Sequence, residues 1–401
     1  KLKESSNFDF TKETTRIFFF LFTSLHKTFQ ADFNFNIMEE EKRQCGYFLE
    51  RKKRNCRMTV RKGEIFCGEH ALERVACPLD PKHTVDKQKL KKHILKCPSR
   101  PPDDPEPYYS KNVNASTDED IPEISIHDVN DDVILDLICR VKSIKISVRK
   151  DIRSHSAVCR DIGSQKHILQ NASILSHLQR CEDISDSIFV EFGSGRGELT
   201  YWLTKTNPNK KYFLVDKASQ RRKFDNKLKN EDDSICVRRI RTDIADLVLG
   251  KIDEAKAVVG LSKHLCGAAT DLALRCLSSS SSKVKGVIIA LCCHHRCSWS
   301  SYAGKTFYKK HFEPNEFYLI RGLTSWATCG TDKSKETINE GKPQRFKFSI
   351  EEKEEIGRMA KRILDFGRLE YLRERVPHLS TTELIQYTES DISLENVMLF
   401  A

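Results

Sequence analysis

The stretch IFVEFGSGRGEL, residues 188–199, decides the fold of this chain. It predicts a buried strand, a tight turn at three glycines and the start of a helix. Similar apolar runs predict a series of strands over 187–192, 212–215, 257–261, 284–291, 317–320 and 397–400, and helical periodicity predicts helices over 133–178 and 350–376. Short apolar strands separated by helices are typical of an α/β fold, with a doubly wound parallel sheet covered by helices on both faces.

The turn has the spacing G-x-G-x-G, at Gly193, Gly195 and Gly197. Dinucleotide-binding folds use G-x-G-x-x-G instead and place a pyrophosphate on the helix N-terminus. The acidic Glu191 at the strand end suits a cationic or amine-bearing ligand better than a phosphate, which indicates S-adenosylmethionine. Asp216 ends the next predicted strand, where a carboxylate can accept both ribose hydroxyls. Asp243 follows as a third acid and is the candidate for adenine recognition.

Two further segments, 260–271 and 290–297, carry reactive side chains where strands of the sheet should end. Open α/β sheets bind ligands on this side. One cleft is therefore expected to gather Lys263, His264, Cys266, Asp271, Cys292, His294 and His295. Lys263 and His264 should directly follow one strand, and His294 and His295 its neighbour, so that both pairs face the reacting group. We predict these two pairs as catalytic and rank Lys263 and His294 first.

Three chemistries are open for this cleft. A lysine with a lowered pKa or a histidine could remove the proton of a hydroxyl that is being methylated. Cys292 or Cys293 could instead be the nucleophile for methylation of carbon 5 of a pyrimidine. A cluster of cysteine and histidine could also hold a zinc ion. Buried Cys and His side chains can also have no role beyond packing.

The N-terminal part carries two tandem sets of metal-ligand residues, over 38–75 and 76–100. The first has the spacing C-x10-C-x10-C-x2-H, at Cys45, Cys56, Cys67 and His70. The second has the spacing C-x5-H-x9-H-x3-C, at Cys77, His83, His93 and Cys97. Structural zinc takes four N or S ligands, so we expect about two structural Zn²⁺, although the sets could interleave. A segment this small and charged needs the metal in order to fold.

Charge and composition point to a polyanionic partner. Of the net +11, residues 38–97 supply +7, with 16 Lys and Arg against 9 Asp and Glu. The basic runs at 51–54 and 87–96 could contact phosphates, or could be an ordinary solvated face. No apolar run approaches the roughly 18 to 20 residues that span a bilayer. The cysteine spacing and the lack of a secretory leader predict a reduced, intracellular protein of the nucleus, the cytoplasm or both.

The remaining segments are predicted to lie outside the two domains. Six of the twelve prolines fall between positions 98 and 122, which predicts a linker over 101–125 and a catalytic domain over 126–401. Residues 1–37 precede the first methionine and lack a domain pattern. We interpret them as a translated leader or a gene-model artefact, with a targeting arm as the alternative.

The two Cys/His sets, followed by VEFGSGRGELT, LVDK, SKHLCGAATDLALRCL, ALCCHHRCSW and GLTSWATCG, resemble the eukaryotic tRNA 2′-O-methyltransferases that modify nucleotide 4 of the acceptor stem. The resemblance runs from about Cys45 to near the C-terminus. It implies a Rossmann-like class I methyltransferase sheet behind a small zinc-binding head, S-adenosylmethionine as donor, and a ribose 2′-hydroxyl of the tRNA acceptor stem as acceptor. The second set also resembles a zinc finger of a minor-spliceosome protein. No protein partner is implied.

This resemblance leaves the catalytic base open, because the Lys-Asp-Lys-Glu set of many ribose methyltransferases has no recognisable counterpart here. An A-form stem exposes its 2′-hydroxyls, so a ribose target needs no base flipping and the head could dock by shape and phosphate contacts. Two rival functions are an RNA-base methyltransferase with a cysteine nucleophile and a non-enzymatic zinc adaptor of RNA processing. The intact glycine turn and its acids disfavour the adaptor.

Overall fold

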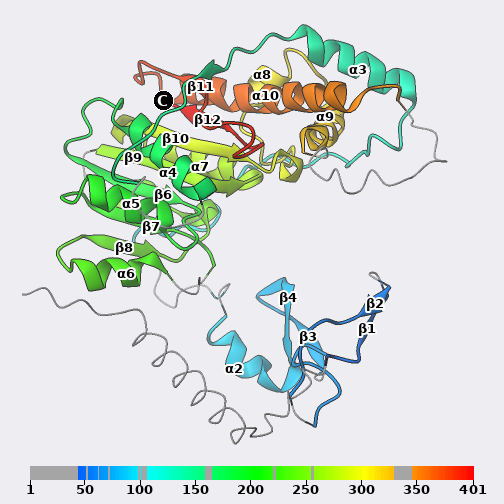
Figure 1. The fold of residues 1–401 in the computed structure, drawn as a ribbon, viewed down its shortest axis with the longest axis vertical. Helices are drawn as coiled ribbons and strands as arrows, with labels where there is room; N and C mark the ends of the chain where they lie inside the picture. Colours follow the sequence, from blue (N-terminus) through cyan, green and yellow to red (C-terminus); the bar gives the residue numbers. More distant parts are fainter. Residues whose placement is uncertain are drawn as a thin grey trace, which may run out of the picture. The chain divides into compact units, whose positions relative to one another are not determined.

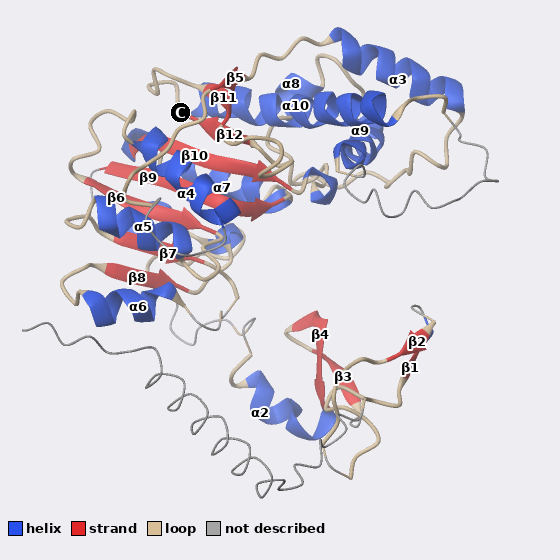
Figure 2. Cartoon of the chain, in the orientation of Figure 1, coloured by secondary structure: helices blue, strands red, loops and turns tan. Residues whose placement is uncertain are grey.

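The computed structural model of this 401-residue chain describes residues 44–50, 53–61, 63–70, 73–97, 100, 106–158, 165–218, 220, 223–253, 257–328 and 346–401. The chain divides into two compact units, Lys1–Cys97 and Pro98–Ala401. Figures 1 and 2 show the elements of each unit. The leader expected over 1–37 lies outside the described residues.

The second unit is built on one eight-stranded sheet. In spatial order its strands are β5 (Arg149–Lys150), β11 (Glu383–Gln386), β12 (Val397–Phe400), β10 (Val284–Cys292), β9 (Ala257–Cys266), β6 (Ser187–Phe192), β7 (Tyr212–Val215) and β8 (Val237–Ile240). The five strands from β10 to β8 are parallel, as predicted. β12 runs antiparallel to both of its neighbours, so the sheet is mixed and not wholly parallel.

Helices cover both faces of this sheet, which confirms the predicted α/β architecture. They are α4 (Gln165–Leu178), α5 (Glu198–Thr206), α6 (Phe224–Glu231), α7 (Ala268–Ser278) and α10 (Ile350–Arg375). Alternate side chains of a strand point to opposite faces. Ile188, Val190 and Phe192 accordingly share a core with α7 and the last turns of α10. Phe189 packs in a separate core with α4, α5 and α6. Burial on both sides explains why β6 is apolar along most of its length.

A second layer of helices packs around the first half of α10. It consists of α3 (Asp131–Ser143), α8 (Lys305–Tyr308) and α9 (Phe317–Thr324). The strand predicted over 317–320 is wrong, because these residues form the first turn of α9. A short apolar run does not distinguish a buried strand from a buried helix. Here Glu313 and Glu316 form a capping box around the turn Pro314–Glu316, which leads directly into α9.

The other helix predictions differ in accuracy. The helix predicted over 350–376 is confirmed as α10, whose start is set by a capping box between Ser349 and Glu352. The helical region predicted over 133–178 contains two helices, α3 and α4, and the described residues between them, 144–158, are not helical. Within the described part of the chain, no helix combines the length and apolar character needed to cross a bilayer.

The predicted linker is partly integrated into the second unit. Residues 106–125 contain no helix and no strand, as expected from their composition. However, the buried Asn114 donates through Nδ2 to the carbonyls of Ile244 and Leu247, at 2.7 Å each. Farther along, Glu123 forms an ion pair with Arg321 at 2.8 Å. The structured part of the second unit therefore begins well before the predicted boundary at residue 126.

The first unit is small. It contains two short antiparallel pairs, β1 (Phe48–Leu49) with β2 (Arg54–Asn55) and β3 (Arg74–Cys77) with β4 (Asp80–Asp86), followed by the turn Lys87–Lys89 and α2 (Leu90–Ile94). Its apolar cluster is formed by three cysteines, against which Leu49 and Val60 pack. So small a core supports the expectation that metal stabilises this unit.

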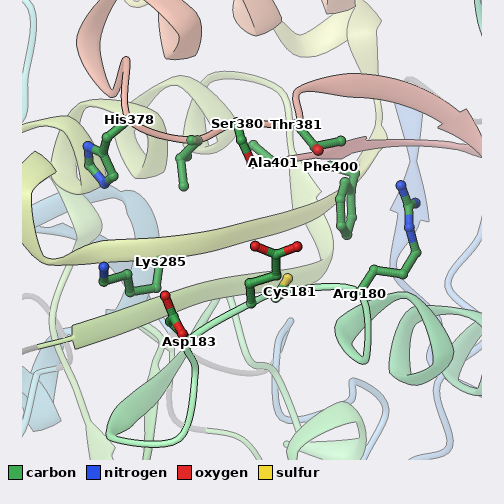
Figure 3. A pocket seen from close by; sticks show the side chains of 11 residues that line it. Arg180, Cys181, Asp183, Lys285, His378, Ser380, Thr381, Phe400 and Ala401 are labelled. Atoms are coloured by element: carbon green, nitrogen blue, oxygen red, sulfur yellow. The ribbon is translucent and has the colours of Figure 1, made fainter.

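The two edges of the main sheet differ in character. Parallel strands end at the same edge, so the glycine turn after β6 and the residues after β7, β9 and β10 share the carboxyl edge. A pocket of about 140 Å³ lies at the opposite edge, where Lys285, His378 and Ala401 are among its lining residues (Figure 3). None of the predicted site residues lines it. The residues predicted after β7, β9 and β10 instead belong to the carboxyl edge.

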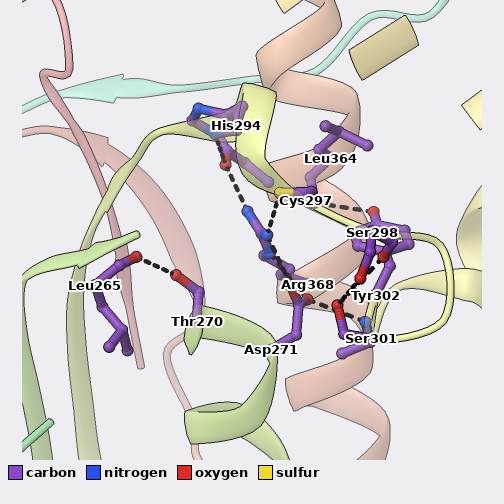
Figure 4. A network of polar contacts seen from close by, with 12 residues as sticks. Leu265, Thr270, Asp271, His294, Cys297, Ser298, Ser301, Tyr302, Leu364 and Arg368 are labelled. Atoms are coloured by element: carbon purple, nitrogen blue, oxygen red, sulfur yellow. Dashed lines mark hydrogen bonds and ion pairs between the residues drawn. The ribbon is translucent and has the colours of Figure 1, made fainter. Parts of the chain in front are cut away.

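A buried ion pair joins α7 to α10 beneath that edge (Figure 4). Arg368 donates to Asp271 through Nε at 3.1 Å and through Nη2 at 2.8 Å, and both residues have an exposed fraction of 0%. The same guanidinium lies 3.0 Å from the Cys297 sulfur. Asp271 was predicted to lie in the cleft, but it is part of this structural pair instead.

We expect Asp271→Ala to destabilise the second unit by about 3 to 5 kcal/mol, because it removes the carboxylate that compensates a buried guanidinium. All three tryptophans lie in this unit, so urea unfolding followed by tryptophan fluorescence measures its free energy of unfolding. The control is Arg358→Ala, whose exposed i,i+4 pair with Glu354 should contribute at most about 1 kcal/mol. Equal losses in the two variants would contradict the assignment.

Candidate active site and zinc centres

The three glycines of the turn all have left-handed backbone angles, with φ of +62° at Gly193, +51° at Gly195 and +81° at Gly197. A Cβ on Gly193 would lie 2.9 Å from the Leu265 side chain, and one on Gly197 would lie 2.6 Å from that of Leu214. These two glycines are required by packing as well as by φ. A Cβ on Gly195 would meet no described atom within 4 Å, so this glycine leaves room for a ligand beside the turn.

Glu191 supports the start of α5, the helix that follows this turn. The first helical residue of α5 follows Gly197, which has no side chain with which to cap the helix. Glu191 supplies the cap, because its Oε2 accepts from the Thr200 amide at 3.1 Å and from the Thr200 hydroxyl at 2.5 Å. Burial raises the pKa of Glu191 to about 7. The structure therefore gives Glu191 a positioning role, and its direct contact with a cofactor stays a prediction.

Asp216 and Asp243 lie at the same edge of the sheet. Asp216 follows β7, and its carboxylate accepts from the amides of Gly195 and Ala218, at 2.7 Å each. Asp243 follows β8 and accepts from the Ala245 amide at 3.1 Å, while its other oxygen is 3.5 Å from Lys217 Nζ. Asp216 is thus tied directly to the glycine turn, with Asp243 one strand farther out.

Arg239 is a second support of the turn, and no sequence pattern had indicated this role. Its Nη1 donates to the Gly195 carbonyl at 2.9 Å and to the Ser194 hydroxyl at 3.0 Å. Its other nitrogens form a bidentate pair with Asp225 at 2.7 and 2.8 Å. The only sequence signal was an arginine inside a short strand, which is too common to indicate this role.

Lys263 lies within β9 and not after it, because this strand continues five residues beyond the predicted end. Side chains alternate along the strand, so Lys263 is buried, with 7% exposed, whereas His264 is exposed. Lys263 Nζ donates to the His167 carbonyl at 3.2 Å. Burial lowers the pKa of Lys263 to about 8, and the charges of Glu198 and Glu191 oppose this shift. His167, at the start of α4, was not predicted from sequence.

The two histidines after β10 lie in different environments. His295 is exposed, as a residue of the cleft surface can be. His294 has 1% exposure, and its Nε2 lies 2.6 Å from Asp365 of α10. His294 thus lies against Asp365 rather than at an open surface, and its role toward the reacting group stays a prediction. A histidine beside a buried carboxylate fits a structural network, and the His294 charge, after the opposing effect of burial, helps to hold the pKa of Asp365 at about 2.

Three cysteines gather at the ends of the two central strands. Cys266 ends β9 and Cys292 ends β10, and the two residues are paired across the strands. Their sulfur atoms are 3.9 Å apart. Cys293 follows, and the three sulfur atoms all lie within 4.8 Å of one another. Cys266 and Cys292 are among the residues expected in one cleft, and the sequence leaves open whether Cys292 or Cys293 is a nucleophile or the cluster holds a metal ion.

The first Cys/His set forms one compact group in the head. All four ligand atoms of Cys45, Cys56, Cys67 and His70 lie within 4.8 Å of one another. His70 Nδ1 is 3.4 Å from the Cys45 sulfur and 3.3 Å from the Cys67 sulfur. Such spacing of three sulfurs and one nitrogen fits a tetrahedral zinc ion.

The second set forms a separate group of the same kind. The ligand atoms of Cys77, His83, His93 and Cys97 also lie within 4.8 Å of one another. The two sulfurs are 3.6 Å apart, and the two Nε2 atoms are 3.1 Å apart. Each set thus gathers by itself and the two do not interleave. Four donors complete each site, so both zinc ions are structural rather than catalytic.

We expect Cys67→Ser and His93→Ala each to lose about one equivalent of zinc and to unfold the finger concerned, because metal binding supplies the folding free energy. Elemental analysis of the purified full chain gives the metal count, and circular dichroism reports the local unfolding. Cys139→Ser, an exposed position on α3, should keep the wild-type count. Freshly purified protein without stoichiometric zinc would contradict both centres.

Comparison with known families agrees with this two-part organisation. The family model described as "Methyltransferase TRM13" matches residues 169–401. The model "CCCH zinc finger in TRM13 protein" matches residues 43–71, and the "U11-48K-like CHHC zinc finger" matches residues 74–98. The two finger matches cover the two four-ligand groups.

Curated relatives match along most of their length. The Homo sapiens "tRNA:m(4)X modification enzyme TRM13 homolog" is 32% identical, over 89% of this chain and 94% of the relative. The Saccharomyces cerevisiae "tRNA:m(4)X modification enzyme TRM13" is 31% identical, over 89% of this chain and 95% of the relative. The chain therefore belongs to the TRM13 methyltransferase family, with a CCCH and a CHHC zinc finger in its N-terminal unit.

Proposed function

We propose that this protein transfers a methyl group from S-adenosylmethionine to a ribose 2′-hydroxyl at nucleotide 4 of the tRNA acceptor stem. The curated relatives are named as tRNA:m(4)X modification enzymes, which supports tRNA as the substrate class. The observation that carries the chemistry is the pairing of an open glycine turn with a buried lysine of lowered pKa at one edge of the sheet.

The residues around the turn fit the cofactor. The space beside Gly195 admits a ligand close to the backbone. Asp216 and Asp243 offer carboxylate oxygens that can accept hydrogen bonds from the ribose and from the adenine amino group. Glu198, the first residue of α5, places a carboxylate whose charge acts on Lys263, and negative charge here suits a sulfonium cation. When bound, the cofactor supplies the electrophilic methyl group.

Lys263 is the proposed general base. The 2′-hydroxyl must lose its proton as its oxygen forms the new bond to carbon, and a neutral lysine Nζ can accept that proton. An ordinary lysine is protonated at neutral pH, but a pKa of about 8 leaves an appreciable neutral fraction. The hydrogen bond to the His167 carbonyl holds the amine in place. The exposed His264 and His295 are the second candidates.

The head is the proposed docking surface for the acceptor stem. The basic run over 87–96 lies on the turn Lys87–Lys89, on α2 and on the two residues after it. Its lysines are exposed: Lys87, Lys89, Lys91, Lys92 and Lys96. Half of the other basic run, residues 51 and 52, lies outside the described residues. Exposed lysines on a metal-stabilised surface can contact the phosphates of an A-form stem without reading its sequence.

The proposed function also implies a cellular compartment for this protein. Zinc ligation requires reduced cysteines, and tRNA is present in both the nucleus and the cytoplasm. We therefore place this protein in one or both of these compartments.

The proposed acceptor is tested by incubating the purified full chain with tRNA and isotopically labelled S-adenosylmethionine. We expect label in a 2′-O-methylated nucleoside at position 4, identified by mass spectrometry of nucleosides and of ribonuclease fragments. Label at carbon 5 of a pyrimidine would instead support attack by Cys292 or Cys293 on the base. No incorporation into tRNA would contradict the proposal as a whole.

Cofactor binding should depend on Gly195. Gly195→Asp introduces a side chain into the space beside the turn, so we expect calorimetry to detect no S-adenosylmethionine binding. Gly63→Asp is the matched control, because Gly63 also has a positive φ and open surroundings but lies in the head. It should bind the cofactor as the wild type does. Unchanged binding by Gly195→Asp would place the cofactor elsewhere.

The rate should follow the titration of Lys263. A base acts in its neutral form, so we expect kcat to rise with pH up to about 8 and then to level off. Lys263→Met should lower kcat by roughly 10²-fold or more and remove this rise, while cofactor affinity persists. Lys205→Met changes a lysine that pairs with Glu231 on the surface, and should keep the wild-type profile. A wild-type profile in Lys263→Met would assign the base to another group.

A further inference from the structure

The cysteine cluster at the carboxyl edge of the sheet has the geometry of a metal site. A tetrahedral zinc with Zn–S bonds of about 2.3 Å separates its sulfur ligands by about 3.8 Å. The Cys266 and Cys292 sulfurs are 3.9 Å apart, close to this value and far beyond a disulfide bond of about 2.05 Å. The sulfur of Cys293 completes a group whose members all lie within 4.8 Å, the same limit that the two finger sites satisfy.

The backbone at Cys293 supports a function for this cluster. Cys293 has φ +52° and ψ +44°, the left-handed conformation that residues other than glycine rarely adopt. This conformation ends the extended backbone of β10 and leads into the turn His294–Arg296. It allows two consecutive cysteines of one strand end to bring their sulfurs to the same point, although neighbouring side chains of a strand normally diverge. Strain of this kind tends to persist where a site requires it.

We propose that Cys266, Cys292 and Cys293 form a third metal site, which binds a thiophilic divalent cation such as Zn²⁺. The two zinc-finger matches end at residue 98, so this site is separate from both fingers. Among the described residues, no histidine or carboxylate joins the group, so the protein supplies three ligands and the fourth position is open to water or to a bound substrate group. Three protein ligands with one open position are typical of catalytic rather than structural zinc.

The surroundings suit the charge of such a complex. Three thiolates and one divalent cation carry a net charge of −1. Arg296 lies in the turn His294–Arg296 that follows Cys293, and its positive charge acts on Cys266. Cys266 also lies three residues after Lys263 on β9, so the proposed metal belongs to the edge at which methyl transfer is proposed.

The test is a metal count on the full chain, purified under reducing conditions, supplied with a small excess of Zn²⁺ and then freed of unbound metal. We expect three equivalents in the wild type and two in Cys293→Ser, which changes a half-buried residue. Cys139→Ser, the exposed control, should retain three. The double variant Cys67→Ser with His93→Ala disables both fingers and should retain one equivalent, which isolates the proposed site even if Cys293→Ser unfolds.

Two results would overturn the proposal. The first is a wild-type count of two together with complete loss of metal in the double finger variant. The second is a disulfide between Cys266 and Cys292, detected by mass spectrometry of the unreduced protein. Neither result would affect the proposed methyl transfer, because that activity is measured separately on tRNA.

Discussion

The left-handed glycine turn after β6 is the constraint on which the candidate site depends. Its backbone is held from two sides, since the Gly195 amide donates to Asp216 and the Gly195 carbonyl accepts from Arg239. These two supports come from the next two strands of the sheet. The turn therefore takes its shape only when β6, β7 and β8 are side by side. The shape of this five-residue motif therefore depends on the neighbouring strands as well as on its own glycines.

The buried charge at this edge follows from the length of β9. The strand continues past its apolar run 257–261 and carries Lys263 into the interior, while the neighbouring His264 stays exposed. Burial is what lowers the pKa of this lysine, and the acids Glu191 and Glu198 keep the shift moderate. An amine that can be neutral near physiological pH is thus obtained from strand geometry and desolvation.

Helix α10 links the helical layer to the same edge. Its first half packs with α3 and α9, and its last turns pack against the sheet. Between these cores, Asp365 binds His294 and Arg368 binds Asp271, so the residues after β9 and β10 are anchored to one helix (Figure 4). Removal of one partner alone would leave a buried polar group without its compensation, so the two members of each pair depend on each other.

The sequence by itself determined the elements whose local pattern is unambiguous: the strands 187–192, 212–215 and 397–400, the helix α10, the glycine turn and the two tandem ligand sets. Burial on both faces, a capping box and fixed ligand spacing each leave a local signature. Only the tertiary structure decided that 317–320 is helical, that the segment before residue 126 packs on the sheet unit, and that His294 is buried while Lys263 lies inside a strand. It also brought Arg239 and His167 to the site and the three cysteines to one point. These outcomes depend on which strands and helices become neighbours, and contacts between residues far apart in the chain leave no periodic pattern in either segment.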